Sequence, residues 1–354
     1  MPEVTLLPRT TVFGYMDHNY ITLTERVTDH LGERPAHLPR QRMWKVRAGQ
    51  TGLAQGAHER PLVFSGNDLP GVMLSGAVRS YITRYGVVPG NRTVVFTNND
   101  DAYRTALALQ GAGAHVVVVD LRRDLKGELV KAVRAAGIEV MSGSAVTIAA
   151  GTQRIARVEI SPVNEGATQV LDDPIHMDCD LLAMSGGLTP AVHLHSQARG
   201  KLGWDDQQLC FKPTTVHEAS FNAGAGNGVF AADKAIENGM QAGTAAARAA
   251  GFDIADGSAP EVAAPAQSWR PLAAWKVTNG MGEGEGPKAF VDYQNDVTAS
   301  DVKLAVREGY QSVEHVKRYT TLGMATDQGK TSNINGLAIL ADTLGRDIPE
   351  VGTT

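Results

Sequence analysis

Cysteine is the rarest residue in this chain, with only Cys179 and Cys210 among 354 residues. Two cysteines are too few for a disulfide framework or for a zinc site built on thiolates. So few cysteines suit a reducing compartment, where thiols stay reduced and do not form disulfides. We therefore expect a cytoplasmic protein in which both cysteines are small buried apolar side chains.

Long apolar runs and a marked excess of one charge are also missing. No apolar run approaches the roughly 18 residues of a membrane helix, and residues 1–5 lack the basic and apolar regions of a signal peptide. The net charge is −5 and the pI is about 6.1, which gives no electrostatic basis for binding nucleic acid or an anionic membrane. We expect neither as a partner.

The sequence has no opening strand followed by a G-x-G-x-x-G turn, although a strand–helix alternation follows further along. Continuous apolar runs predict strands buried on both faces of a parallel sheet. The predicted elements are a helix at 74–85, strands at 93–97, 115–120 and 138–141, helices at 101–111 and 125–136, an antiparallel excursion at 144–176 and a strand at 180–187. This order predicts an α/β protein with doubly wound, Rossmann-like nucleotide-binding domains.

The turn after the strand at 93–97 is a poor nucleotide site. It lacks the glycines that let a backbone approach a pyrophosphate, and Asp100 and Asp101 would repel a phosphate there. We interpret this unit as structural. Asp120 stands where a ribose-binding acid would lie, and without the glycines we interpret it as a loop or cap residue.

Two glycine segments resemble the FAD/NAD(P)-binding flavoprotein superfamily with two dinucleotide domains. Residues 53–61 resemble its A-T-G-A segment, which passes near the nucleotide of the first domain, and we interpret the flanking His58 and Arg60 as hinge residues. Residues 223–232, before a helix predicted at 239–250, resemble its C-terminal pyrophosphate contact. A generic glycine turn is the alternative. The resemblance assigns to this site Val12, Gly56, Gly224, Ala225, Phe230 and Ala232.

The last module follows a segment rich in proline, glycine and alanine, which predicts a linker over residues 253–288. Thr298 or Ser300 can cap a first helix, and Ser312 a second. A loop further on gathers hydrogen-bond donors that could hold a flavin phosphate, and a plain capping turn is the alternative. Its donors are Lys330, Thr331, Ser332 and Asn333.

The same module resembles a small helical [2Fe-2S] domain of bacterioferritin-associated ferredoxin and of several amine oxidoreductases. The two sequences share Val-Thr and Gln-Gly anchors, and the four cysteine positions of that domain fall on Asp292, Gln294, Asp327 and Ser332. An iron–sulfur cluster needs thiolate ligands. We therefore expect the fold without an iron–sulfur cluster or another metal.

Segments in order along the whole chain are similar to the α subunit of heterotetrameric sarcosine oxidase. They are residues 6–15, 56–61, 66–73, 95–100 and 315–333. The resemblance implies NAD in the first nucleotide domain, FMN at an interface with a β-type flavoprotein subunit that carries FAD, and smaller γ and δ subunits. It implies oxidative demethylation of sarcosine to glycine, formaldehyde or methylene-tetrahydrofolate, and hydrogen peroxide.

The resemblance also predicts a division of the chain. Residues 1–75 are the remainder of a first dinucleotide-binding domain, 76–190 a second, 191–252 the return to the first, 253–288 the linker and 289–354 the cysteine-less module. The first G-x-G-x-x-G stretch would precede this sequence and a folate domain would follow it. We therefore expect an incomplete NAD site, no catalytic residue and an inactive chain when it is alone.

Two other functions stay open at this stage. A stand-alone NAD(P)H-dependent flavin oxidoreductase would need a redox cysteine pair and an intact fingerprint, and the sequence has neither. A structural partner subunit with vestigial sites is the third possibility.

Overall fold

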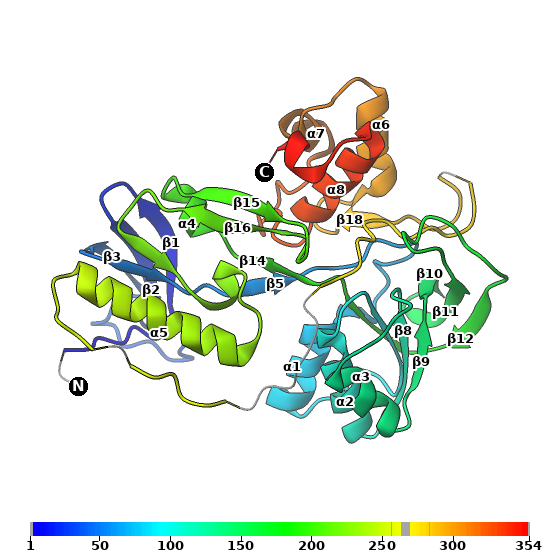
Figure 1. Ribbon diagram of the computed structural model, residues 1–354, viewed down its shortest axis with the longest axis horizontal. Helices are drawn as coiled ribbons and strands as arrows, with labels where there is room; N and C mark the ends of the chain where they lie inside the picture. Colours follow the sequence, from blue (N-terminus) through cyan, green and yellow to red (C-terminus); the bar gives the residue numbers. More distant parts are fainter. Residues whose placement is uncertain (1–2, 256, 263–269, 283, 353–354) are drawn as a thin grey trace. The chain divides into compact units, whose positions relative to one another are not determined.

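The structure is a computed structural model that describes residues 3–255, 257–262, 270–282 and 284–352. It contains two compact units (Figure 1). Unit 1 comprises Met1–Ala57, Pro190–Asp205 and Phe211–Ala264, and unit 2 comprises His58–Thr189, Asp206–Cys210 and Pro265–Thr354. The first boundary thus follows residue 57, where the sequence predicts residue 75, and the last module belongs to unit 2. No helix in the described ranges is both long and apolar enough to cross a bilayer.

Unit 1 combines small sheets with one long helix. Its antiparallel sheet has the order β1 (Thr10–Met16), β2 (Tyr20–Arg26), β3 (Gln41–Arg47), and its other elements are β4 (Thr51–Leu53), α4 (His193–Gln197), β15 (Lys201–Asp205), β16 (Cys210–Thr215), β17 (Ser220–Asn222), the 3-10 turn η1 (Gly224–Asn227) and α5 (Ala232–Ala249). Strands β4 and β17 pair in parallel, so their carboxyl ends meet at one edge. Tyr15, Leu53 and Ala198 form a small buried core.

Unit 2 is built on a parallel sheet of order β6-β13-β7-β8-β9. Its strands are β6 (Val72–Leu74), β7 (Arg92–Thr97), β8 (His115–Asp120), β9 (Glu139–Ser142) and β13 (Leu181–Ser185), its helices α1 (Ser75–Tyr85), α2 (Asp101–Gly111) and α3 (Glu128–Ala135). Alternate residues of β7 enter two cores: Val95 packs with the helices, whereas Val94 and Phe96 pack with an antiparallel sheet. That sheet is β10 (Ser144–Gly151), β11 (Ile155–Pro162) and β12 (Ile175–Asp178). The predicted α/β class and strand order along the chain are confirmed.

The last module of unit 2 consists of a short hairpin and four helices within the described part of the chain (Figure 1). These are β18 (Phe290–Asp292), β19 (Val297–Thr298), α6 (Ala299–Arg307), α7 (Val313–Thr320), α8 (Asn333–Leu344) and α9 (Ile348–Val351). Thr298 caps α6 in a reciprocal pair with Asp301, as predicted. Ser300 lies inside that helix instead, and Ser312 precedes α7 without a side-chain cap bond.

Much of the segment predicted as a linker is embedded in unit 2. The Leu272 amide donates to the Asn98 carbonyl at 3.1 Å, and the Val277 amide to that of Val63 at 2.8 Å. The Ala274 and Val277 side chains are buried in the core. Residues 270–282 and 284–288 therefore belong to the fold, and composition concealed this because their partners are distant in sequence. Residues 256, 263–269 and 283 of the predicted linker lie outside the described residues.

Helix α5 begins at Ala232, seven positions before the Gly239 that the sequence favours as its start. No residue of α5 is fully buried, and the space beside Gly239 and Gly243 is open. The helix was misread because Gly239 was taken as a boundary rather than as an interior residue.

Candidate functional site

The first predicted site lies at the carboxyl edge of β4 and β17. Gly56 has a φ of +81°, and a Cβ added at Gly226 would lie in ordinary van der Waals contact with the Gly56 backbone, 3.5 Å from its nitrogen. The structure therefore brings Gly56 together with η1, which carries Gly224 and Ala225. A glycine lets a backbone approach a nucleotide pyrophosphate, because it has no side chain in the way.

The backbone amide of Gly224, in the η1 turn beside Gly56, already has a hydrogen-bond partner. Gly224, with a φ of +62°, donates its amide to Asn238 Oδ1 at 3.0 Å. The first turn of α5 starts at Ala232 and has no side-chain cap, so its amides face no partner from a capping residue. These first-turn amides, rather than that of Gly224, are the groups that suit a phosphate. Val12 lies on β1 with 36% of its surface exposed.

The second predicted site is the loop that leads into α8. Asp327 accepts hydrogen bonds from the Gly329 amide at 3.0 Å and from the Thr331 hydroxyl at 2.9 Å, and Lys330 Nζ donates to the Asp327 carbonyl at 3.0 Å. Partial burial raises the pKa of Asp327, but these bonds and the Lys330 charge outweigh it, so the pKa is lowered. Two of the predicted donors, Lys330 and Thr331, are thus engaged in a hydrogen-bonded turn around Asp327.

The other two predicted residues each carry a buried oxygen that lacks a hydrogen-bond partner among the described residues. Ser332 Oγ and Asn333 Oδ1 have no hydrogen-bond partner among the described residues, and Ser332 is only 1% exposed. Gly323 and Gly329 leave room for the Asn333 amide, because a Cβ at either would lie 2.0 Å from its oxygen. Unsatisfied buried polar atoms are uncommon in native proteins and often mark functional sites.

Asp292, at a former cysteine position, orders the backbone of the same module. Its carboxylate accepts from the amides of Gln294 at 2.9 Å, Asn295 at 3.2 Å and Gly323 at 2.7 Å, and it is 2% exposed. A carboxylate here connects two loops by hydrogen bonds. At this one of the four positions, a carboxylate therefore stabilises the module through hydrogen bonds.

His58 lies on strand β5 (Ala57–Glu59) and Arg60 directly follows it. We interpreted both from the sequence as hinge residues. Burial lowers the pKa of the half-buried His58 first and the positive charge of Lys330 lowers it second, whereas Asp327 raises it. His58 is therefore within electrostatic range of Lys330 and Asp327. Arg60 is 3% exposed, and its pKa falls to about 10 because of burial. No sequence motif pointed to this proximity.

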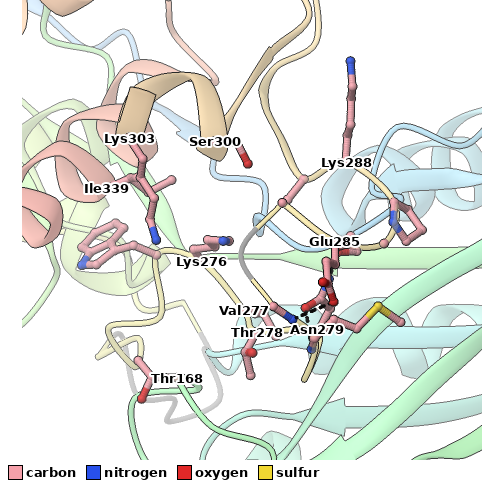
Figure 2. A pocket seen from close by; sticks show the side chains of 18 of the residues that line it. Thr168, Lys276, Val277, Thr278, Asn279, Glu285, Lys288, Ser300, Lys303 and Ile339 are labelled. Carbon is pink, nitrogen blue, oxygen red and sulfur yellow. Dashed lines mark hydrogen bonds between the residues drawn. The ribbon is translucent and has the colours of Figure 1, made fainter. Parts of the chain in front are cut away.

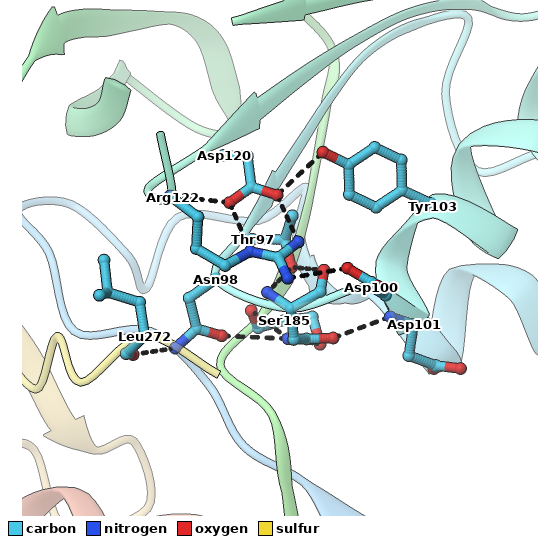
Figure 3. Close-up of polar contacts among 10 residues, drawn as sticks. Thr97, Asn98, Asp100, Asp101, Tyr103, Asp120, Arg122, Ser185 and Leu272 are labelled. Carbon is cyan, nitrogen blue, oxygen red and sulfur yellow. Dashed lines mark hydrogen bonds and ion pairs between the residues drawn. The ribbon is translucent and has the colours of Figure 1, made fainter. Parts of the chain in front are cut away.

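The carboxyl edge of the parallel sheet in unit 2 is filled by an ion-pair network (Figure 3). Arg122 Nη1 lies 2.7 Å from Asp100 Oδ1, and Arg122 Nη2 lies 2.7 Å from Asp120 Oδ2. Tyr103 donates its hydroxyl to the same Asp120 oxygen at 2.9 Å. The guanidinium thus stands where a nucleotide would bind in a Rossmann unit, which agrees with our structural interpretation of this unit.

A cavity of about 510 Å³ opens elsewhere in unit 2, between the 273–289 segment and helices α6 and α8 (Figure 2). Lys276 and Lys303 contribute positive charge to its wall, and Glu285 and Asp342 negative charge. The lining residues do not include any of the cofactor-binding residues predicted from the sequence. The cavity is therefore separate from both predicted sites.

Comparisons with known proteins agree with the resemblance. The sarcosine oxidase A3 domain model matches residues 286–354. Sarcosine oxidase subunit alpha of Corynebacterium sp. (strain P-1) is 42% identical over 99% of this chain and 36% of its own length, and that of Rhizobium meliloti (strain 1021) is 40% identical over 100% of this chain and 34% of its own. The chain thus spans about a third of the length of these relatives.

A solved structure shows the same fold. L-proline dehydrogenase from P. horikoshii matches with a TM-score of 0.62 and 17% sequence identity, over 98% of this chain and 61% of that one. At that identity the likeness concerns the fold alone. The identity to sarcosine oxidase over the whole chain is what assigns a family: the chain belongs to the sarcosine oxidase α subunits and corresponds to a portion of one.

Proposed function

We propose that this chain is the cofactor-holding portion of an α subunit in a sarcosine oxidase-like complex. The observation that carries the proposal is the identity of 42% to a sarcosine oxidase α subunit over 99% of the chain. In the proposed complex a β-type flavoprotein subunit with FAD oxidises the amine, oxygen accepts the electrons, and smaller γ and δ subunits complete the assembly. This chain supplies binding surfaces rather than catalytic groups.

NAD is the proposed ligand of unit 1. The backbone of Gly56 and η1 gives it a close approach, and the first turn of α5 offers amides to a phosphate. Because Asn238 already occupies the Gly224 amide, part of the cradle is closed. We therefore expect the chain alone to bind NAD weakly.

FMN is the proposed ligand of the Lys330 loop, at an interface with the β-type subunit. An ammonium group has three hydrogens, and one of those on Lys330 goes to the Asp327 carbonyl. The other two remain for a phosphate. Ser332 and Asn333 add polar atoms that have no partner among the described residues.

The proposal is tested by producing the chain with a β-type flavoprotein subunit and supplying sarcosine. We expect a stable complex that contains FMN and FAD and forms hydrogen peroxide, whereas the chain alone forms none. The amount of each flavin and the peroxide yield are measured on the purified complex. Sarcosine oxidation by the chain alone, or its failure to associate with the flavoprotein, would contradict the proposal.

Replacing Lys330 with alanine should weaken FMN retention in that complex by roughly 1.5–3 kcal/mol, the range for a hydrogen bond to a charged group. The FAD content should not change, because FAD lies on the partner. Lys317→Ala, on α7, is the matched control for removal of a lysine from the same module. If FMN content and peroxide formation are unchanged in Lys330→Ala, the loop is only a capping turn.

A further inference from the structure

Buried polar atoms without a partner gather around one short strand. The described part of the chain has eight such atoms, and five of them lie in three neighbouring segments. These segments are β5 with the following Arg60, the strand β14 (Leu188–Pro190) that pairs with β5, and the start of α8. They are Glu59 Oε1, Arg60 Nη2, Thr189 Oγ1, Ser332 Oγ and Asn333 Oδ1. Each such atom costs desolvation free energy unless something binds it.

The pairing of β5 with β14 places several of these residues on one face. The Arg60 amide donates to the Gly187 carbonyl at 2.8 Å, and the Ala191 amide to that of Gly56 at 2.9 Å. In this register His58 stands opposite Thr189. Side chains two apart on a strand share a face, so Arg60 is on the same side as His58, and Glu59 points to the other.

The start of α8 lies against the same segment. Asn335 Nδ2 donates to the Pro61 carbonyl at 2.9 Å, and Ser332 is one helical turn before Asn335 and therefore on the same side of α8. The charge of Lys330 acts on His58, which agrees with this placement. The Ser332 hydroxyl thus belongs to the group around β5, at the positive end of a 12-residue helix.

Arg60 supplies a buried positive charge with no carboxylate partner among the described residues. Its Nε donates to the Gly186 carbonyl at 2.9 Å and Nη1 to that of Leu209 at 2.6 Å, and its guanidinium lies 5.0 Å from the Trp275 ring centroid. Nη2 has no hydrogen-bond acceptor within the described ranges. Because a buried charge without a counter-ion is unfavourable, a bound anion would stabilise this arrangement.

We propose that Arg60, Thr189 and Ser332 form a binding site for an oxyanion, either a phosphate or a carboxylate group. Nη2 of Arg60 supplies a charged donor, and the two hydroxyls supply neutral donors beside the positive end of α8. The inference rests on the proposed function in one respect, because the phosphate of FMN is one possible source. Free phosphate and the carboxylate of a small substrate are the others.

The test is thermal unfolding of the full chain in sodium phosphate, sodium formate or FMN, against sodium chloride at equal ionic strength. We expect a saturable rise in melting temperature with an oxyanion and none with chloride. Ser332→Ala and Thr189→Val should each weaken the apparent affinity about fivefold, the loss of one hydrogen bond. Neither should lower the melting temperature without ligand, because each removes an unsatisfied hydroxyl. Arg60→Gln should abolish the effect.

Thr93→Val is the matched control, since Thr93 Oγ1 is an unsatisfied buried hydroxyl on β7. It should leave oxyanion affinity unchanged. The proposal is wrong if no oxyanion shifts the melting temperature, or if Thr93→Val weakens binding as much as Ser332→Ala does. It is also wrong if the ultraviolet absorbance of a thiolate is lost in Arg60→Gln, because Cys210, whose charge would raise the pKa of Arg60, is then the counter-ion.

Comparing phosphate, formate and FMN identifies which kind of molecule supplies the oxyanion. Tighter binding of FMN than of phosphate identifies the flavin phosphate, and binding of formate alone identifies a carboxylate. A complex that binds phosphate but does not oxidise sarcosine would remove the proposed function and leave the oxyanion site intact.

Discussion

Replacing Arg122 with methionine is expected to lower the free energy of unfolding of unit 2 by about 3–5 kcal/mol, the cost of breaking a buried ion pair. Arg122 bonds to Asp100 and Asp120, whose side chains are 1% and 0% exposed (Figure 3). Methionine fills a similar volume but removes the guanidinium from both buried carboxylates. Burial already raises the pKa of Asp120 despite the opposing bonds from Arg122 and Tyr103.

The measurement is a urea titration followed by hydrogen exchange at the amides of β7 and β8, which report on unit 2. Arg134→Met, at the exposed end of α3, is the control and should change the free energy by less than about 0.5 kcal/mol. Adding Asp100→Asn and Asp120→Asn to Arg122→Met should restore much of the loss, because neutral amides cost less to bury. A loss below about 1 kcal/mol in Arg122→Met would mean that water replaces the guanidinium.

The parallel sheet of unit 2 was predictable because its central strands contain continuous runs of apolar residues. A strand buried on both faces, such as β8 with Val118 and Val119, carries a continuous apolar run along its centre. The helices between the strands follow from spacing. The ion-pair network was not predictable, because only the fold brings Arg122 to the edge where Asp100 lies.

The candidate sites, like the sheet, were only partly predictable from the sequence. Glycines mark where a backbone approaches closely, so Gly56 and Gly224 could be singled out from sequence. The bond from the Gly224 amide to Asn238 could not, since it depends on where α5 begins. Arg60 was interpreted as a hinge residue because nothing local shows that it is buried and lacks an acidic partner.

The free energy of unfolding of unit 2 should fall as the pH rises from about 4.5 to about 7, by up to about 3 kcal/mol, because of Glu59. Burial of the carboxyl raises its pKa from 4.5 to about 7, and the bond from the Gly76 amide at 2.6 Å only partly opposes this. Between those values the folded protein binds a proton that the unfolded chain has released. Folding is therefore favoured below pH 4.5, and the advantage is lost above pH 7.

Replacing Glu59 with glutamine should remove this decline. The Gly76 amide still finds an acceptor, and no charge has to be buried. Above pH 7 the variant should be more stable than the parent, and near pH 4.5 the two should be similar. Urea titrations at several pH values, with Glu128→Gln on the exposed side of α3 as the control, isolate the effect. Parallel pH profiles for Glu59→Gln and the parent would show that Glu59 ionises normally in the folded protein, and that water or Arg79 reaches its buried oxygen.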